Sequence, residues 1–114
     1  MNRYRLSKAG ISVKEGIERF NDNLEVYEKC LYEFPEDDHY NQLLTALEED
    51  DAQAAFAAAH ALKGVAGNLS LTRLYADIVP LVEVLRAGTV NGADALFEPV
   101  TIDYKEVIEA LTTK

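Results

Sequence analysis

Apolar residues recur every three or four positions along most of this chain, the spacing that places them on one face of an α-helix. The pattern predicts a short N-terminal helix that carries Val13, Ile17 and Phe20, followed by longer helical segments. In chain order, the buried positions expected in three of these are Leu24, Tyr27, Leu31 and Phe34, then Tyr40, Leu43, Leu44 and Leu47, then Leu74, Ile78, Leu81, Val82 and Leu85. The last segment has Leu96, Val100, Tyr104, Val107 and Leu111.

Polar residues mark where several of these helices begin. Ser12-Val13-Lys14-Glu15 has the form of a capping box, in which Ser12 is the N-cap and Glu15 bonds back to it. Asp50 or Asp51 is expected to cap the most helix-prone segment, which runs from residue 52 to about 69. Thr72 is expected to cap the helix after it.

Glycines and prolines mark other boundaries. One helix should end at Ala87-Gly88, and the last should begin at Asn91-Gly92. Pro35 either starts a new helix or bends a longer one, and the sequence leaves both possibilities open. Pro80 and Pro99 each remove a backbone hydrogen bond, but the apolar pattern continues past both, so we expect kinks rather than helix ends.

The fold class follows from these segments and their short connections. No segment alternates apolar and polar residues with a period of two, so no sheet is expected. We predict an all-α protein, an antiparallel four-helix bundle with up-down-up-down topology and a short N-terminal helix. At 114 residues, the chain should form one domain, residues 1–114.

Composition excludes several classes of function. A formal net charge of −9 excludes non-specific nucleic-acid binding, which needs clustered Lys and Arg. No apolar stretch approaches the roughly 20 residues of a membrane span, and no export signal precedes the helices. The single cysteine, Cys30, cannot form an internal disulfide, which fits a cytoplasmic protein.

The helix predicted for 52–69 has an unusual outer face. At about 100° per residue, its expected core residues are Ala54, Ala55, Ala58, Ala61, Leu62, Val65, Ala66 and Leu69. His60 points away from them, and its face also carries Gln53, Phe56, Ala57, Lys63, Gly64 and Gly67. No acidic residue occurs between positions 52 and 68. Since a glycine inside a helix costs about 1 kcal/mol relative to alanine, two of them suggest that another group approaches the backbone here.

These residue types suit phosphoryl transfer. A neutral imidazole is nucleophilic near neutral pH and can carry a phosphoryl group as a reactive phosphoramidate. Lys63 can offer an ammonium group to the phosphoryl oxygens, and Gly64 leaves space beside the ring. A single exposed histidine most often has no function, so this interpretation depends on all these features sharing one face.

The segment from Ala59 to Leu69, AHALKGVAGNL, resembles the signature of histidine-containing phosphotransfer (HPt) domains, A-H-x-L-K-G-x-[AS]-x-x-[LI]-G. The resemblance extends to residues 10–16, 20–34 and 81–88, so that together with the motif it spans about 80 residues of the chain. One departure is Ser70, which stands where the family usually has glycine.

The resemblance implies that His60 accepts a phosphoryl group from a receiver-domain aspartate and passes it to another receiver. It implies that Lys63 and Gly64 flank the phosphoryl site, and that the partner docks on the outer face of the helix. There we assign partner contacts to Gln53, Phe56, Ala57 and Gly67. The expected partners are response-regulator receiver domains and a hybrid histidine kinase. The divalent cation would belong to the receiver, and the carrier would be a monomer with no cofactor, metal or kinase activity of its own.

Other functions are also open. A helical adaptor could dock receiver or kinase domains on the same face without being phosphorylated. A kinase is excluded because the chain has no glycine-rich phosphate loop and no room for an ATP-binding domain. A metal-binding bundle is disfavoured because His39 and Cys30 lie far from His60 in the sequence and His60 faces outward.

Overall fold

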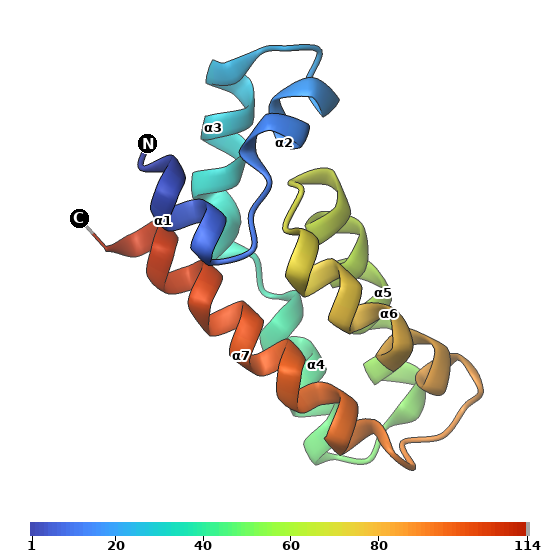
Figure 1. The fold of residues 1–114 in the computed structure, drawn as a ribbon. Coiled ribbons are helices and arrows are strands. Elements are labelled where there is room, and N and C mark those ends of the chain that lie inside the picture. The colour runs from blue at the N-terminus through green and yellow to red at the C-terminus, as the bar shows by residue number, and fades with distance from the viewer. Residues whose placement is uncertain (114) are drawn as a thin grey trace.

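The computed structural model describes residues 1–113, and all of the regular elements in this range are helical (Figure 1). They are α1 (Arg3–Lys8), α2 (Val13–Arg19), α3 (Leu24–Glu33), the 3-10 helix η1 (Phe34–Glu36), α4 (His39–Glu48), α5 (Ala52–Asn68), α6 (Thr72–Arg86) and α7 (Ala93–Thr112). The only β-type pairing among the described residues is an isolated bridge between Ile11 and Leu71. The predicted all-α class is therefore confirmed for this range.

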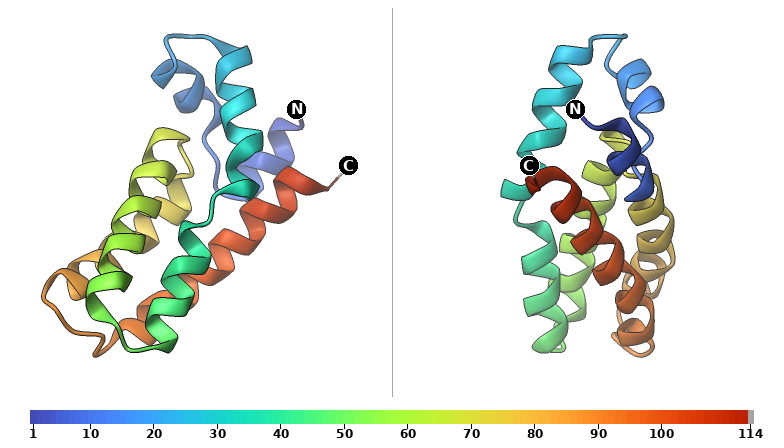
Figure 2. Two further views of the ribbon diagram at one scale, coloured as in Figure 1. Left: turned by 180° about the vertical axis from the view of Figure 1, so that it is seen from behind. Right: turned by 60° about the vertical axis from the view of Figure 1, so that its left-hand side comes forward.

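Four helices, α4 to α7, lie side by side, and each contacts the next one along the chain (Figure 1). At one end of this group, α3 extends beyond the others and contacts α2, while α1 contacts α2 and α7 (Figure 2). Both chain termini lie at that end, where Arg5 Nη1 donates a hydrogen bond of 3.0 Å to the Thr113 carbonyl. None of the described helices combines the length and apolarity that a bilayer crossing requires.

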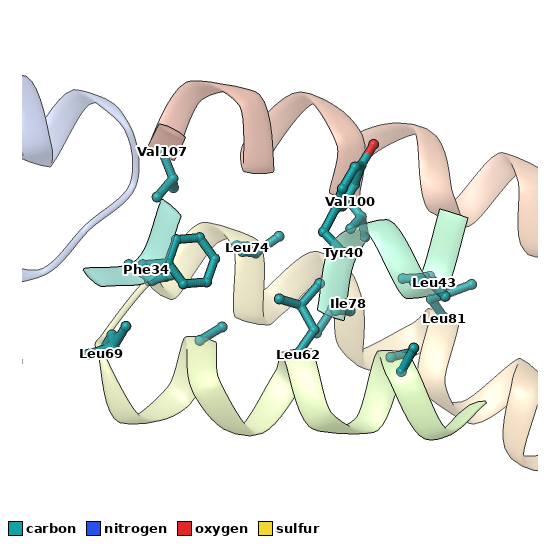
Figure 3. Close-up of a cluster of buried hydrophobic side chains, with 14 of the residues drawn as sticks. Phe34, Tyr40, Leu43, Leu62, Leu69, Leu74, Ile78, Leu81, Val100 and Val107 are labelled. Atoms are coloured by element: carbon teal, nitrogen blue, oxygen red, sulfur yellow. The ribbon is translucent and has the colours of Figure 1, made fainter. Parts of the chain in front are cut away.

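The core runs between these helices, with side chains from α4, α5, α6 and α7 pointing into a shared interior (Figure 3). Aromatic rings fill its middle, where Tyr40 stacks on Tyr104 at 4.0 Å between ring centroids and Phe34 meets Tyr104 edge-on. Most residues predicted to face inward are buried or partly buried. Two are not. Leu24, the first residue of α3, is 40% exposed beyond the end of the bundle, and Ala54 faces a surface groove along α4.

The capping box predicted at the start of α2 does not form. Ser12 is the N-cap residue, but its side chain makes no capping hydrogen bond. Its backbone N–H, which Glu15 was expected to bind, donates instead to the Ser70 carbonyl at 2.9 Å. Glu15 accepts from Ser70 Oγ at 3.4 Å and from Arg19 Nε at 3.2 Å. A contact between distant segments thus replaces the local motif.

The other boundaries agree more closely with the sequence. Asp51, one of the two expected caps, accepts from the Ala54 N–H at 3.0 Å at the start of α5. The cap predicted for α6 is wrong, because Leu71 is the N-cap and Thr72 is already helical. The Thr72 hydroxyl donates to the Gly10 carbonyl at 2.9 Å. As predicted, α6 ends before residues 87–88 and α7 begins after 91–92.

The prolines and the first helix add detail that the sequence left open. Pro35 lies in the first turn of the short 3-10 helix η1, which separates α3, ending at Glu33, from α4, so it neither begins α4 nor bends one longer helix. Helices α6 and α7 continue through Pro80 and Pro99, as expected, and kinks there stay a prediction. Helix α1 was not predicted: it is short, and Leu6 is its one buried residue.

Contacts made by residues of α2 and α3 hold α2 beside the C-terminal end of α5. The Tyr27 hydroxyl donates to the Leu69 carbonyl at 2.8 Å. Burial, with a smaller contribution from the Glu15 carboxylate, raises the pKa of Tyr27 to about 12, so the hydroxyl keeps the proton that it donates. Gly16 lies so close to the Tyr27 ring that a Cβ atom there would overlap it. These contacts bring α2 next to the outer face of α5.

Candidate functional site

His60 lies on α5 and is exposed, whereas Ala59 and Leu62 on the same helix are fully buried. The predicted orientation of the imidazole, away from the core, is therefore confirmed. The other predicted site residues also lie outside the core: Gln53, Ala57 and Gly64 are exposed, and Phe56, Lys63 and Gly67 are partly buried. Helical periodicity accounts for this, because positions three, four and seven apart share one face.

An aromatic ring lies against the imidazole. Phe56, one turn before His60 on α5, stacks on it with 5.7 Å between ring centroids and 21° between ring planes. The Arg86 guanidinium, from the last turn of α6, lies over the Phe56 ring with Cζ 5.1 Å from the centroid. Arg86 Nε in turn donates to Glu83 Oε2 at 3.0 Å. No sequence pattern indicated that Arg86 and Glu83 belong to the site, because only the packing of α6 on α5 brings them here.

Gly64 stands one turn after His60 and adjoins open space. A Cβ atom built at this position would have no heavy atom within 4 Å, so no packing contact within the chain requires a glycine there. Lys63 precedes it and is partly buried. Gly64 therefore leaves open space beside the helix one turn after His60, whereas Phe56 lies one turn before it.

Gly67 has a different environment. A Cβ atom there would lie 3.2 Å from Cε2 and 3.4 Å from Cδ2 of Tyr75 on α6. The group that approaches this glycine is therefore a side chain of the same molecule. The sequence could not distinguish Gly67 from Gly64, because Tyr75 comes from the next helix.

An open groove of about 360 Å³ runs beside this face. Its walls include Lys63 and Gly64 from α5, Tyr75 from α6, and Glu15 and Arg19 from α2. Glu15 and Arg19 form an ion pair across one turn of α2, at 3.2 Å. Sequence reasoning did not include α2 in the site, because only the folded chain brings it there.

Charge is distributed unevenly between this face and the rest of the protein. The chain has a net charge of −9, yet α5 itself carries no acidic residue. The nearby acids described above, Glu83 and Glu15, are each paired with an arginine. The surroundings of His60 are therefore less negative than the molecule as a whole, which favours the approach of an anionic group.

The second histidine has different surroundings. His39, the first residue of α4, lies with Nδ1 3.0 Å from a carboxylate oxygen of Asp37. No group of three or more His, Cys, Asp or Glu side chains that could hold a metal ion occurs within residues 1–113.

Comparison with known families places this site in context. A sequence model of the Hpt domain matches residues 27–113, from within α3 to the C-terminal end of α7. The chain belongs to the Hpt domain family. Hpt domains carry phosphoryl groups in two-component phosphorelays, interact with receiver domains and histidine kinases, and are not themselves kinases. Searches of curated proteins and of solved structures gave no significant match.

One unusual backbone position follows α5. Ser70, which stands at the glycine position of the motif noted in the sequence, adopts φ +57°, the left-handed conformation that glycine reaches without strain. It is buried, and its hydroxyl donates to Glu15 as described above. A serine in this conformation costs about 1 kcal/mol, but the turn between α5 and α6 keeps the shape that a glycine would give. Helices α1 and α2, including Glu15, lie outside the matched range.

Proposed function

We propose that His60 is the phosphoaccepting residue of this Hpt domain, taking a phosphoryl group from a receiver-domain aspartate and passing it to another receiver. The observation that carries the proposal is the exposed imidazole with unobstructed space at Gly64 beside it, within the Hpt-matched residues. His39 is the alternative phosphoacceptor, but it pairs with Asp37, and the residues three and four positions after it are Gln42 and Leu43 rather than a glycine.

The reaction we propose is a simple displacement at phosphorus. An imidazole nitrogen of His60 uses its lone pair to form an N–P bond while the P–O bond to the donor aspartate breaks. The aspartate leaves as a carboxylate, and the proton on the second ring nitrogen stays in place during the step. Transfer to the acceptor aspartate is the reverse process. Lys63 contributes positive charge for the phosphoryl oxygens, and Gly64 leaves room for them.

The partner side is also a proposal. We expect receiver domains to dock on the outer face of α5 through Gln53, Phe56, Ala57 and Gly67, and a hybrid histidine kinase to supply one of these receivers. The divalent cation of the reaction would be bound by the receiver. The free, half-buried Cys30 fits the cytoplasmic location expected from the sequence.

We further propose that helices α4 to α7 form the up-down-up-down bundle expected from the sequence, within one domain of residues 1–114. The connections support this topology, because only residues 49–51, 69–71 and 87–92 join successive helices. Connections this short leave an antiparallel neighbour as the natural next position.

The test is transfer of labelled phosphate from a panel of phosphorylated receiver domains to the wild type, to His60→Gln and to His39→Gln. We expect an acid-labile, base-stable label on the wild type and on His39→Gln, and none on His60→Gln. Circular dichroism and thermal melting of His60→Gln should match the wild type, since the side chain is exposed.

Three results would contradict the proposal. Label on His60→Gln, or its loss in His39→Gln, would assign the phosphoryl group to another residue. Binding of a receiver without any label on the wild type would favour an adaptor, which should also act normally after His60→Gln.

A further inference from the structure

The aromatic stack at the site links two helices to the imidazole. Phe56 is partly buried and packs against the hydrophobic core, so its backbone and inner edge are fixed. One part of the ring stacks on His60 at 5.7 Å, and the Arg86 guanidinium lies 5.1 Å from its centroid. The bond from Arg86 to Glu83 holds the guanidinium in place.

An exposed imidazole on a helix would otherwise sample several rotamers. Side chains four residues apart on a helix are neighbours, and two stacked rings restrict each other's rotation about χ1 and χ2. His60 therefore has a planar wall on the side of Phe56 and open space on the side of Gly64. Because the nucleophilic lone pair lies in the plane of the imidazole, stacking on Phe56 fixes the plane in which a phosphoryl group must approach.

Arg86 contributes through Phe56. A guanidinium stacked on a phenyl ring is attracted by the ring's electrons, and the planar shape of the group keeps the two in register. Because Arg86 belongs to α6, it fixes the orientation of Phe56 relative to a helix other than the one that carries His60.

We infer that Phe56 is a positioning residue for the phosphoaccepting imidazole and that Arg86 anchors Phe56 in this role. The inference rests on the proposed role of His60. It assigns to Phe56 a contribution to the rate of the chemical step, beyond any contact with a docked receiver. Alignment of a nucleophile with the reacting atom is a large part of the rate in phosphoryl transfer.

The first experiment compares Phe56→Leu with the wild type in single-turnover transfer from a phosphorylated receiver. Leucine keeps the apolar bulk but removes the planar face. We expect the maximal transfer rate to fall about tenfold, while the Kd for the receiver stays within about twofold. Phe56→Tyr, which restores the ring, should recover most of the rate.

The second experiment removes the partner surface by using phosphoramidate as the phosphoryl donor. The P–N bond of the donor breaks, ammonia leaves and the phosphoryl group bonds to His60. Phe56→Leu should again react about tenfold more slowly than the wild type. The NMR signals of the His60 ring protons should also shift in this variant, because they lose the ring current of Phe56.

Arg86→Ala tests the anchor without altering the core, since Arg86 is exposed. We expect a fall of about threefold in the phosphoramidate reaction, and no change for Arg3→Ala, which removes an exposed arginine from α1. Should Phe56→Leu fail to fold, the test of the inference rests on Arg86→Ala alone. An unchanged rate of the phosphoramidate reaction in Arg86→Ala would then overturn the inference.

The remaining outcomes separate this inference from the proposed function. A wild-type rate for Phe56→Leu with phosphoramidate would overturn the positioning role, as would a raised Kd with an unchanged maximal rate, the result expected for docking alone. Absence of label on the wild type from every donor would instead refute the role of His60.

Discussion

Two helical glycines of this protein have opposite surroundings. Gly64 in α5 adjoins space that no atom of the chain fills, whereas Gly16 in α2 lies under the ring of Tyr27. A glycine inside a helix lowers stability, so each position needs a reason. For Gly16 the reason is internal packing. For Gly64 the proposed transfer reaction would supply it.

Gly64→Ala is expected to separate stability from activity. The new methyl group meets nothing in the chain, and alanine is the better helix former, so the free energy of unfolding should rise by about 1 kcal/mol. Transfer from a receiver to His60 should slow severalfold, because the methyl group occupies the open side of the imidazole. Urea denaturation and single-turnover transfer measure the two effects. A more stable variant with an unchanged transfer rate would remove Gly64 from the site.

Gly16→Ala should behave in the opposite way. Its methyl group overlaps the Tyr27 ring, which must shift and strain the hydrogen bond to the Leu69 carbonyl. Overpacking of this kind costs roughly 1 to 3 kcal/mol of the free energy of unfolding. Phosphoramidate labelling of His60 at a temperature where the variant is folded should stay near the wild-type rate. If the variant melted like the wild type, the contact between α2 and α3 would be looser than described.

At the scale of elements, the contact between α6 and α7 contains a buried acid. Asp103 is 5% exposed, and its Oδ2 has no hydrogen-bond partner among the described residues. Burial raises the pKa of Asp103 to about 7, and the Asp77 carboxylate on α6 adds to the effect, because it accepts a hydrogen bond from the protonated acid and repels the charged form. Of its charged neighbours, Arg73 acts to lower this pKa and Glu106 acts to raise it.

The stability of the α6–α7 contact should therefore depend on pH. Asp103 titrates near 7 in the folded chain but near its ordinary value of 3.8 when unfolded, so between these pH values the folded state holds a proton that the unfolded state has lost. The contribution of protonated Asp103 to the free energy of unfolding is complete below about pH 3.8 and is lost as the pH rises through 7. Urea denaturation at pH 5 and pH 8 should show the wild type less stable at pH 8.

Asp103→Asn should reduce this difference, because asparagine donates to Asp77 at either pH. The variant should gain roughly 1 to 3 kcal/mol in free energy of unfolding at pH 8, the usual range for relieving an unsatisfied buried polar group. Asp94→Asn, an exposed change in the same helix, is the matched control and should leave the pH dependence as it is. Equal pH profiles for wild type and Asp103→Asn would place the effect elsewhere.

Sequence reasoning predicted elements well where the signal lay within one segment. The α5 helix, its Asp51 cap and its outward His60 follow from periodicity and local capping alone. It failed where a distant segment takes over a local group. The Ser12 N–H goes to Ser70, and the Thr72 hydroxyl goes to Gly10.

The candidate site follows the same division. Its α5 members share a face by helical spacing, and a sequence pattern is enough to gather them. Arg86, Tyr75 and Arg19 come from α6 and α2, and their positions depend on how these helices pack on α5. No spacing rule within one segment can bring such residues together.

At the scale of the whole molecule, charge should keep the protein monomeric. The net charge of −9 makes copies of the chain repel one another at neutral pH. Sedimentation equilibrium at low salt should give a mass of 12.7 kDa that does not change with protein concentration. A mass that rises with concentration would show that an exposed face pairs with a second copy.

The two chain ends lie close together, where Arg5 donates a hydrogen bond to the Thr113 carbonyl. The order of the helices along the sequence could therefore be changed. The ends could be joined through a short linker, and the chain opened in the turn between α6 and α7, where its backbone is exposed around Gly92. Such a circular permutant would begin with α7 and finish with α5 and α6. The α5–α6 hairpin, which carries His60, Phe56 and Arg86, would then stand at the C-terminus, and the rest of the chain would serve as its scaffold.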